Sequence, residues 1–137
     1  MEREFTISTD KSLLIPEDIH DYLSNESYWA KGRTMESVLL SIQNSLCYGI
    51  YINKKQIGFA RVITDYVTFA YLADVYILEA YRGKGLSKQL MAEITAHPDL
   101  QKLRRFVLAT RDAHSLYEKY GFKSLSKPEL WMEIFKE

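Results

Sequence analysis

Four consecutive residues, Arg82, Gly83, Lys84 and Gly85, form the stretch of this chain that is best suited to bind an anion. Glycine has no Cβ atom, so a phosphate can approach the backbone amides closely, and the two basic side chains add positive charge. Apolar residues then recur at helical spacing, at Leu86, Leu90, Met91 and Ile94. Because a helix begins with unpaired N–H groups and a positive dipole end, the stretch predicts a pyrophosphate loop with Lys88 beside it. The alternative is a basic turn that binds nothing.

The segment that precedes this loop, residues 71–78, is apolar except for Asp74 and predicts a buried strand. The order is therefore strand, glycine loop, helix. Two common phosphate motifs do not fit this order. Neither the GxGxxG spacing of dinucleotide-binding proteins nor the GxxxxGK[ST] spacing of P-loops is present.

Two signatures resemble those of the GNAT superfamily of N-acetyltransferases. Residues 77–85, ILEAYRGKG, are similar to the strand and coenzyme A loop of that family, which reads Gln/Arg-x-x-Gly-x-Gly/Ala. Arg82 and Gly85 match, whereas Ser87 stands where the last Gly or Ala belongs. Residues 110–122, TRDAHSLYEKYGF, resemble the second signature, Asn-x-x-Ala-x-x-Leu-Tyr-x-x-x-Gly-Phe, with Thr110 in place of the Asn. The resemblance covers most of the chain and is weakest over residues 1–45.

The resemblance implies that acetyl-CoA is the co-substrate and that no metal takes part. In the family, the strand before the loop separates from the next parallel strand, and the pantetheine arm lies in the gap. The backbone amides of Ile77 and Leu78 would hold that arm and polarise the thioester carbonyl, where the tetrahedral intermediate concentrates negative charge. The remaining cofactor-binding residues would be Arg82, Gly83, Lys84, Gly85, Leu86, Ser87, Lys88 and Thr110.

Tyr117 falls on the tyrosine of the second signature and is our candidate general acid. A phenol with a pKa of about 10 keeps its proton at neutral pH and can pass it to a departing thiolate. The alternative is a core tyrosine on an apolar helical face. His114 precedes it by one turn and is either a base or a hydrogen-bonded structural residue. Asp74 is either a weak candidate for the base or a structural carboxylate, which we favour, and Asp65 is a second weak candidate.

Aromatic residues near predicted loops, together with one arginine, are candidates for binding the acceptor. They could line a pocket for a small amine, such as one whose carboxylate pairs with Arg33, or they could simply be core and lid residues. The candidates are Tyr28, Trp29, Arg33, Phe69 and Tyr71, with Tyr66 beside them.

The function that the resemblance implies is direct transfer of the acetyl group from acetyl-CoA to the primary amine of a small molecule, within a ternary complex. Two alternatives stay open: a peptide or protein N-acetyltransferase, and a non-catalytic module that senses acyl-CoA. Turnover with an amine panel separates the enzyme from the sensor.

Composition excludes several other classes of protein. The 137 residues predict a single domain, which the resemblance identifies as an N-acetyltransferase domain over residues 1–137. The 18 basic residues balance 18 acidic ones, which argues against nucleic acid or a membrane as partner. One cysteine and three scattered histidines predict neither a disulfide framework nor a metal site. The charged start of the chain lacks the pattern of a signal peptide, so we expect a cytoplasmic protein. A homodimer is left open.

The elements that must position these residues follow from periodicity and turn signals. Expected strands cover residues 4–8, 47–52, 56–64, 71–78, 105–110 and 130–135. Expected helices begin at Pro16, after a Thr34 cap, at Gly85 and after an Asp112 cap, the last ending at Gly121. The order β-α-α-β-β-β-α-β-α-β predicts a mixed α/β (α+β) fold. The resemblance implies a mostly antiparallel sheet of six or seven strands with about four helices.

Overall fold

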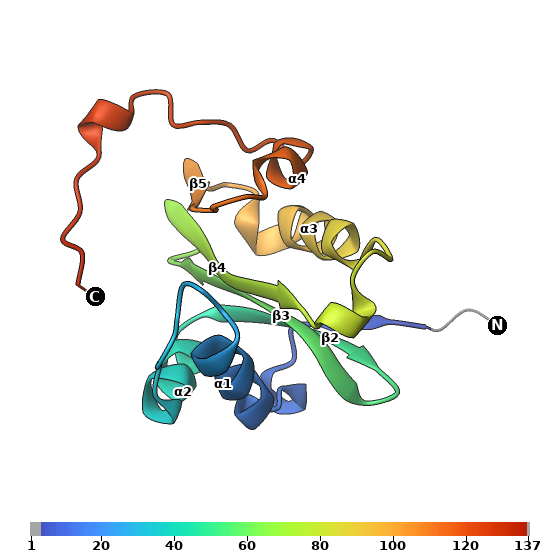
Figure 1. Cartoon of the computed structure of the whole chain (residues 1–137). Coiled ribbons are helices and arrows are strands. Elements are labelled where there is room, and N and C mark those ends of the chain that lie inside the picture. Colours follow the sequence, from blue (N-terminus) through green and yellow to red (C-terminus); the bar gives the residue numbers. More distant parts are fainter. Residues whose placement is uncertain (1–3, 137) are drawn as a thin grey trace.

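The computed structural model describes residues 4–136, which form a five-stranded sheet with two helices on each face (Figure 1). The strands lie in chain order, and every neighbouring pair is antiparallel except β4 and β5, which run parallel. The strands are β1 (Thr6–Ser8), β2 (Leu46–Ile52), β3 (Lys55–Thr64), β4 (Phe69–Ile77) and β5 (Arg105–Leu108). The helices are α1 (Pro16–Asn25), α2 (Met35–Gln43), α3 (Leu86–Ala96) and α4 (His114–Glu118).

The sheet separates two apolar cores. One core packs α3 against the sheet through the four residues whose spacing predicted that helix, and all four are buried. The other core packs α1 and α2 on the opposite face, where Cys47, Phe59 and Tyr76 of the sheet meet them. Thr34 caps α2 as expected, since its side chain accepts a hydrogen bond from the Ser37 amide. The helical spacing of Met35, Val38, Leu39 and Ile42 predicts one apolar face on α2, but Leu39 is exposed.

The hairpin between β2 and β3 confirms the predicted turn. Asn53 and Lys54 both have positive φ, +49° and +69°. Two central residues with positive φ form a type I′ turn, whose twist matches that of the flanking strands. The two expected strands, 47–52 and 56–64, leave residues 53–55 as the turn, but Lys55 already belongs to β3.

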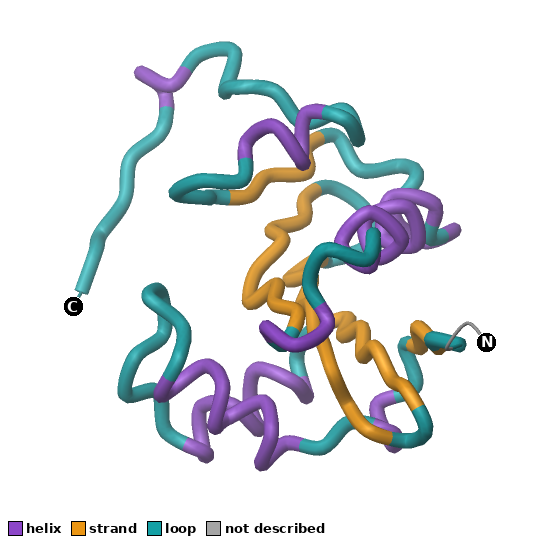
Figure 2. Tube along the Cα trace, turned by 45° about the vertical axis from the view of Figure 1, so that its right-hand side comes forward, coloured by secondary structure: helices purple, strands orange, loops and turns teal. Residues whose placement is uncertain are grey.

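The predicted strand over residues 130–135 is wrong, and the sheet therefore has five strands rather than six or seven. The segment after α4 passes through a 3₁₀ turn at Pro128–Leu130 and then continues without pairing to any described strand. Both ribbon views show it running apart from the sheet (Figures 1 and 2). An alternating pattern gives a strand only where a neighbouring edge supplies hydrogen bonds.

The start of α4 also differs from expectation. Asp112 does not cap the helix; the Ala113 amide donates to the Thr110 hydroxyl at 3.1 Å, and Ala113 occupies the N-cap position. The chain beyond the helix turns at Gly121, whose φ of +97° confirms the predicted left-handed residue.

Candidate active site

A β-bulge in β4 opens the sheet next to the glycine loop. Arg61 of β3 pairs with Ala73, and Phe59 pairs with Tyr76, so two residues of β4 stand opposite one residue of β3. Asp74 lies in this bulge with φ of +55°, a left-handed conformation that aspartate tolerates better than most residues. Bulges bend the strand and increase its twist. The bulge is thus the local cause of a change in the direction of β4.

Beyond the bulge, β4 has no partner on its β5 side. The parallel ladder between β4 and β5 ends at the pair Leu72 and Leu108. A cleft of about 600 Å³ lies at this separation. Residues 72–75 of β4 form one wall, residues 108–113 form the other, and Tyr28, Trp29 and Arg33 enter from the loop between α1 and α2. The separated strands that the family resemblance implied are therefore present.

The carboxylate of Asp74 joins three elements at the base of the cleft. Its oxygens accept hydrogen bonds from Trp29 Nε1 at 2.8 Å, Arg33 Nη1 at 2.7 Å and Arg61 Nε at 2.9 Å. The side chain is 2% exposed, and burial of a charge is tolerated when it is paired and hydrogen-bonded in this way. These contacts support the structural interpretation of Asp74 over a role as base, since three donors occupy its oxygens.

Three arginines line the same cleft. Arg33 and Arg61 share the single carboxylate of Asp74, and the Arg33 side chain remains 24% exposed. The guanidinium carbon of Arg111 lies 3.9 Å from the centroid of the Tyr28 ring, a cation–π contact. The Arg111 amide also donates to the Tyr28 hydroxyl at 3.2 Å, which joins the loop after β5 to the loop after α1.

Four of the five predicted acceptor-binding residues line this cleft: Tyr28, Trp29, Arg33 and Tyr71. Phe69 does not; its ring lies 6.5 Å from that of Trp131. Arg61 and Arg111 line the cleft but were missed by the sequence analysis. Arg61 could have been found, because it is a charged residue inside an otherwise apolar strand pattern.

Tyr117 of α4 stands between this cleft and a second cavity of about 580 Å³. The residue is 9% exposed, and burial raises the pKa of its phenol, with smaller contributions from Tyr28 and Asp112. Within residues 4–136 the hydroxyl makes no hydrogen bond. A phenol in this environment keeps its proton at neutral pH and has a free donor to give.

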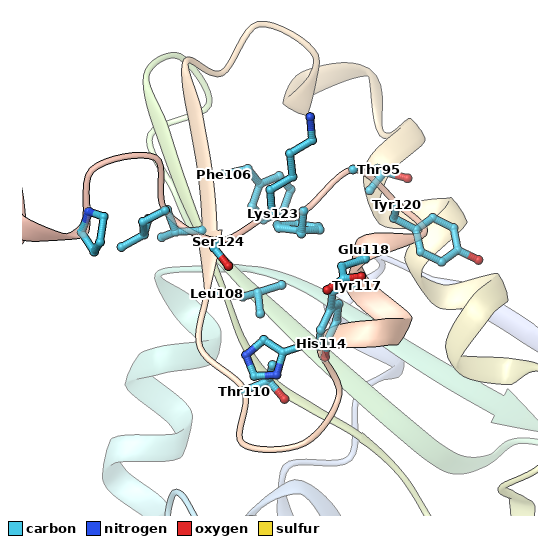
Figure 3. Close-up of a pocket in the computed structure, with 15 residues that line it drawn as sticks. Thr95, Phe106, Leu108, Thr110, His114, Tyr117, Glu118, Tyr120, Lys123 and Ser124 are labelled. Atoms are coloured by element: carbon cyan, nitrogen blue, oxygen red, sulfur yellow. The ribbon is translucent and has the colours of Figure 1, made fainter.

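The other titratable candidates lie elsewhere. His114 lines the second cavity together with Tyr117 (Figure 3), and it does not line the first. Asp65 organises the turn between β3 and β4, where its carboxylate accepts from Thr68 Oγ1 and from three backbone amides. The hydrogen bond from Thr68 Oγ1 is the main cause that lowers the pKa of Asp65. Neither position favours a catalytic base.

The glycine loop has the backbone conformation that the prediction requires. Gly83 and Gly85 have φ of +77° and +79°, and a Cβ atom at either position would point into open space. The first intrahelical bond of α3 runs from the Gln89 amide to the Gly85 carbonyl, so the preceding amides are free of backbone partners in the described chain. Leu86 is buried and anchors the helix, whereas Lys84 and Lys88 are exposed beside the loop.

Three predicted cofactor-binding residues already have partners within the protein. The Arg82 guanidinium donates to the Ile77 carbonyl and to the Tyr22 hydroxyl, both at 2.9 Å. The Leu78 amide donates to the Ile57 carbonyl of β3 at 2.8 Å, so it points away from the cleft. Ile77, one residue earlier, has its amide on the opposite edge of the strand. Thr110 lines the cleft, but its hydroxyl accepts a hydrogen bond from the Ala113 amide at the start of α4.

No three His, Cys, Asp or Glu side chains among residues 4–136 cluster as metal ligands. In the same part of the chain, no helix has the length and apolar character needed to cross a bilayer.

Comparison with known proteins assigns this geometry to a family. The family model of the acetyltransferase (GNAT) domain matches residues 43–124. A Gibberella zeae protein with a provisional name as an acetyltransferase is 31% identical over 136 residues, which cover 85% of this chain and 77% of that protein.

Solved structures agree. A crystal structure of a GNAT-family protein from Xanthomonas campestris pv. campestris is 50% identical and superposes with a TM-score of 0.95, covering 97% of this chain and 94% of the other. A predicted acetyltransferase of Clostridium acetobutylicum, crystallised with acetyl-CoA, has a TM-score of 0.67 at 14% identity, covers 98% and 96% of the two chains, and so shows the fold.

Proposed function

The chain belongs to the GNAT family of acetyltransferases, and from that premise we propose that it transfers the acetyl group of acetyl-CoA to the primary amine of a small, anionic molecule. The single observation that carries this proposal is the open end of the β4–β5 ladder. It forms a cleft that is lined by Tyr117 and by three arginines. The glycine loop follows the same strand.

The donor half of the proposal rests on that loop. The free amides before Gln89 and the exposed Lys84 and Lys88 suit a pyrophosphate at the start of α3. Arg82 acts there by holding the loop, because its guanidinium ties the end of β4 to Tyr22 of α1. The Ile77 amide would meet the pantetheine arm in the separation between β4 and β5.

The transfer step balances with this chain's residues and water. A neutral amine attacks the acyl carbon, a C–N bond forms, and the Ile77 amide stabilises the charge on the carbonyl oxygen. The C–S bond then breaks, and the Tyr117 hydroxyl gives its proton to the departing thiolate. The surplus proton of the new amide nitrogen returns to the phenolate through water, which leaves Tyr117 unchanged. We assign no side chain as the base.

The proposed class of acceptor follows from the charged side chains that line the cleft. The side chains that line the cleft include three arginines and two aspartates, a net charge of +1. Arg33 uses one N–H donor on Asp74, and its side chain stays 24% exposed. A guanidinium fork of this kind matches the geometry of a carboxylate or phosphate. A small amine that carries such a group fits the cleft better than a cationic polyamine does.

An acceptor panel read by free-thiol release tests the proposal. We expect turnover with small anionic amines, weaker turnover with polyamines, and a raised KM for the anionic acceptor in Arg33→Gln with unchanged affinity for acetyl-CoA. The matched control is Lys102→Gln, an exposed cation away from the cleft. Preference for peptide amines would favour a peptide acetyltransferase. Binding of acetyl-CoA without thiol release across the panel would favour a sensor.

A further inference from the structure

A second basic side chain reaches the glycine loop from the hairpin between β2 and β3. Lys55 is the first residue of β3, and its ammonium nitrogen lies 5.6 Å from the centroid of the Tyr81 ring. Lys84 of the glycine loop lies near the same ring, with its nitrogen 5.9 Å from the centroid. A tyrosine ring attracts cations at such distances. Tyr81 therefore joins a cation of the hairpin to a cation of the loop, although the two lysines are far apart in the sequence.

The pairing of β3 with β4 explains why these residues meet. Gly58 of β3 stands opposite Ile77, and the Leu78 amide donates to the Ile57 carbonyl at 2.8 Å. The start of β3 therefore lies beside the chain that leads from β4 into the 3₁₀ turn Glu79–Tyr81 and the glycine loop. The hairpin and this turn lie at the same end of the sheet (Figure 1).

Strand alternation directs Lys55 to the face of the sheet that carries α3. Ile57, two residues later, is buried in the core beneath α3. Gln56 points to the other face, where its side-chain oxygen accepts a hydrogen bond from the Ile15 amide at 2.9 Å. Residues two apart in a strand share a face. Lys55 thus lies on the same face as the helix start proposed to bind the pyrophosphate.

Neither lysine has a carboxylate partner among residues 4–136, where every ion pair involves Asp74. Both lysines are exposed and are therefore accessible to a ligand. The neighbouring acid, Glu79 at the start of the 3₁₀ turn, is exposed and pairs with neither of them within the same residues. Cations without a partner beside a phosphate-binding loop attract a further anionic group.

We propose that Lys55 binds the 3′-phosphate of acetyl-CoA, so that the β2–β3 hairpin selects the 3′-phosphorylated form of the cofactor. The inference rests on the proposed function, since it takes the pyrophosphate to lie at the glycine loop. In coenzyme A the pyrophosphate and the 3′-phosphate are attached to the same ribose. A cation that shares the Tyr81 ring with the loop is therefore close enough to meet the second group. Lysine binds a phosphate as a point charge, without the fixed geometry of a guanidinium.

Calorimetric titrations of the full chain with acetyl-CoA and with 3′-dephospho-acetyl-CoA test the proposal. We expect the wild type to bind the dephospho form more weakly, on the order of tenfold, the contribution of one hydrogen bond to a charged group. Lys55→Gln should weaken the binding of acetyl-CoA by the same factor and leave the affinity for the dephospho form unchanged. The matched control is Lys54→Gln, which removes the exposed lysine before it in the turn and should keep the preference.

Three outcomes overturn the role of Lys55: equal affinity of the wild type for the two thioesters, a Lys55→Gln variant that keeps the preference, and a Lys54→Gln variant that loses as much of it. Circular dichroism checks that each variant is folded. A repeat at high salt is a second measurement, because screening should reduce the preference of the wild type, and a preference independent of salt contradicts an exposed ion pair. If neither thioester binds, the donor half of the proposed function fails as well. Equal binding of both leaves that half intact and removes only the role of Lys55.

Discussion

At the scale of single residues, the site depends on Tyr117 and Asp74, and the two act in different ways. Tyr117 is a buried phenol with a free hydroxyl beside the cleft. Asp74 is a carboxylate whose oxygens are held by Trp29, Arg33 and Arg61. In the proposed function the first gives its proton to the leaving thiolate, whereas the second holds the two guanidinium groups around the bulge.

Replacement of Tyr117 by phenylalanine keeps the ring and removes the proton. We expect kcat to fall by about 10²- to 10⁴-fold, the range of general acid catalysis, with unchanged affinity for acetyl-CoA. Because burial raises the pKa of this phenol, the acid form should persist to a higher pH than that of an ordinary tyrosine and be lost as the pH rises through the raised pKa. Rates over a pH series, with chemistry verified as the slow step, check this. Wild-type kcat in the variant would leave water as the proton source.

Replacement of Asp74 by asparagine tests whether this residue is a structural carboxylate or a catalytic base. Asparagine also tolerates the left-handed conformation, but it leaves Arg33 and Arg61 without their charge partner. Breaking a buried pair costs about 3 kcal/mol, so we expect a large loss in the free energy of unfolding by urea titration. A variant of wild-type stability that has lost only kcat would instead identify Asp74 as the base.

At the scale of elements, the strand–loop–helix unit follows from the sequence, because local signals determine it. Glycine at the loop and the spacing of Leu86, Leu90 and Ile94 predicted α3 and its buried face, as observed. The bulge at Asp74 could not be predicted, since it depends on the register between β3 and β4 rather than on a local pattern. Without the register, neither the open face of Asp74 nor the position of Arg61 follows from the sequence.

The strand prediction for the C-terminal segment was wrong for a different reason. The alternation over residues 130–135 predicted a strand, but the segment does not lie along the free edge of β5 and pairs with no described strand. Four of the predicted acceptor-binding residues line the cleft, and each is an aromatic or charged residue near a predicted loop. Arg111 was missed because only the contact between two loops brings it to Tyr28.

The proposed role of the glycine loop in binding acetyl-CoA can be tested by comparing Gly85 with Gly32, a glycine of similar backbone conformation elsewhere in the chain. Gly85 and Gly32 have nearly the same φ, +79° and +78°, and both face open space. Gly85→Val and Gly32→Val should therefore lose similar stability, on the order of 1–2 kcal/mol. Only Gly85→Val should weaken the binding of acetyl-CoA, because the valine side chain blocks the approach of the pyrophosphate. Calorimetric titration compares the two, and equal affinities would remove the loop from the donor site.

The strand before the loop is expected to act through its backbone. Ile77 is buried in the core beneath α3, so Ile77→Val should lower the free energy of unfolding by about 1 kcal/mol. Turnover should stay near that of wild type, since the amide is unchanged. The measurement is a pair of urea and steady-state titrations. A large loss of kcat would mean that the side chain, and not the amide, determines the position of the thioester.

At the scale of the whole molecule, the elements proposed to bind the two substrates approach the cleft from opposite faces of the sheet. α3 and the glycine loop lie on one face, and the loop between α1 and α2 brings Tyr28, Trp29 and Arg33 to the cleft from the other (Figure 1). The separation of β4 from β5 is the passage between them. In the proposed function, an acetyl group passes directly from donor to acceptor through this separation, without a covalent intermediate on the protein.

The most direct test of that account is a count of acetyl groups. The protein, acetyl-CoA and a small anionic amine are incubated together, and free thiol, acetylated amine and the intact mass of the protein are measured at the same times. We predict one acetylated amine for each thiol released and no acetyl group on the protein. Thiol release without acetylated amine, or an acetylated protein that forms before the product, would contradict direct transfer in the β4–β5 cleft.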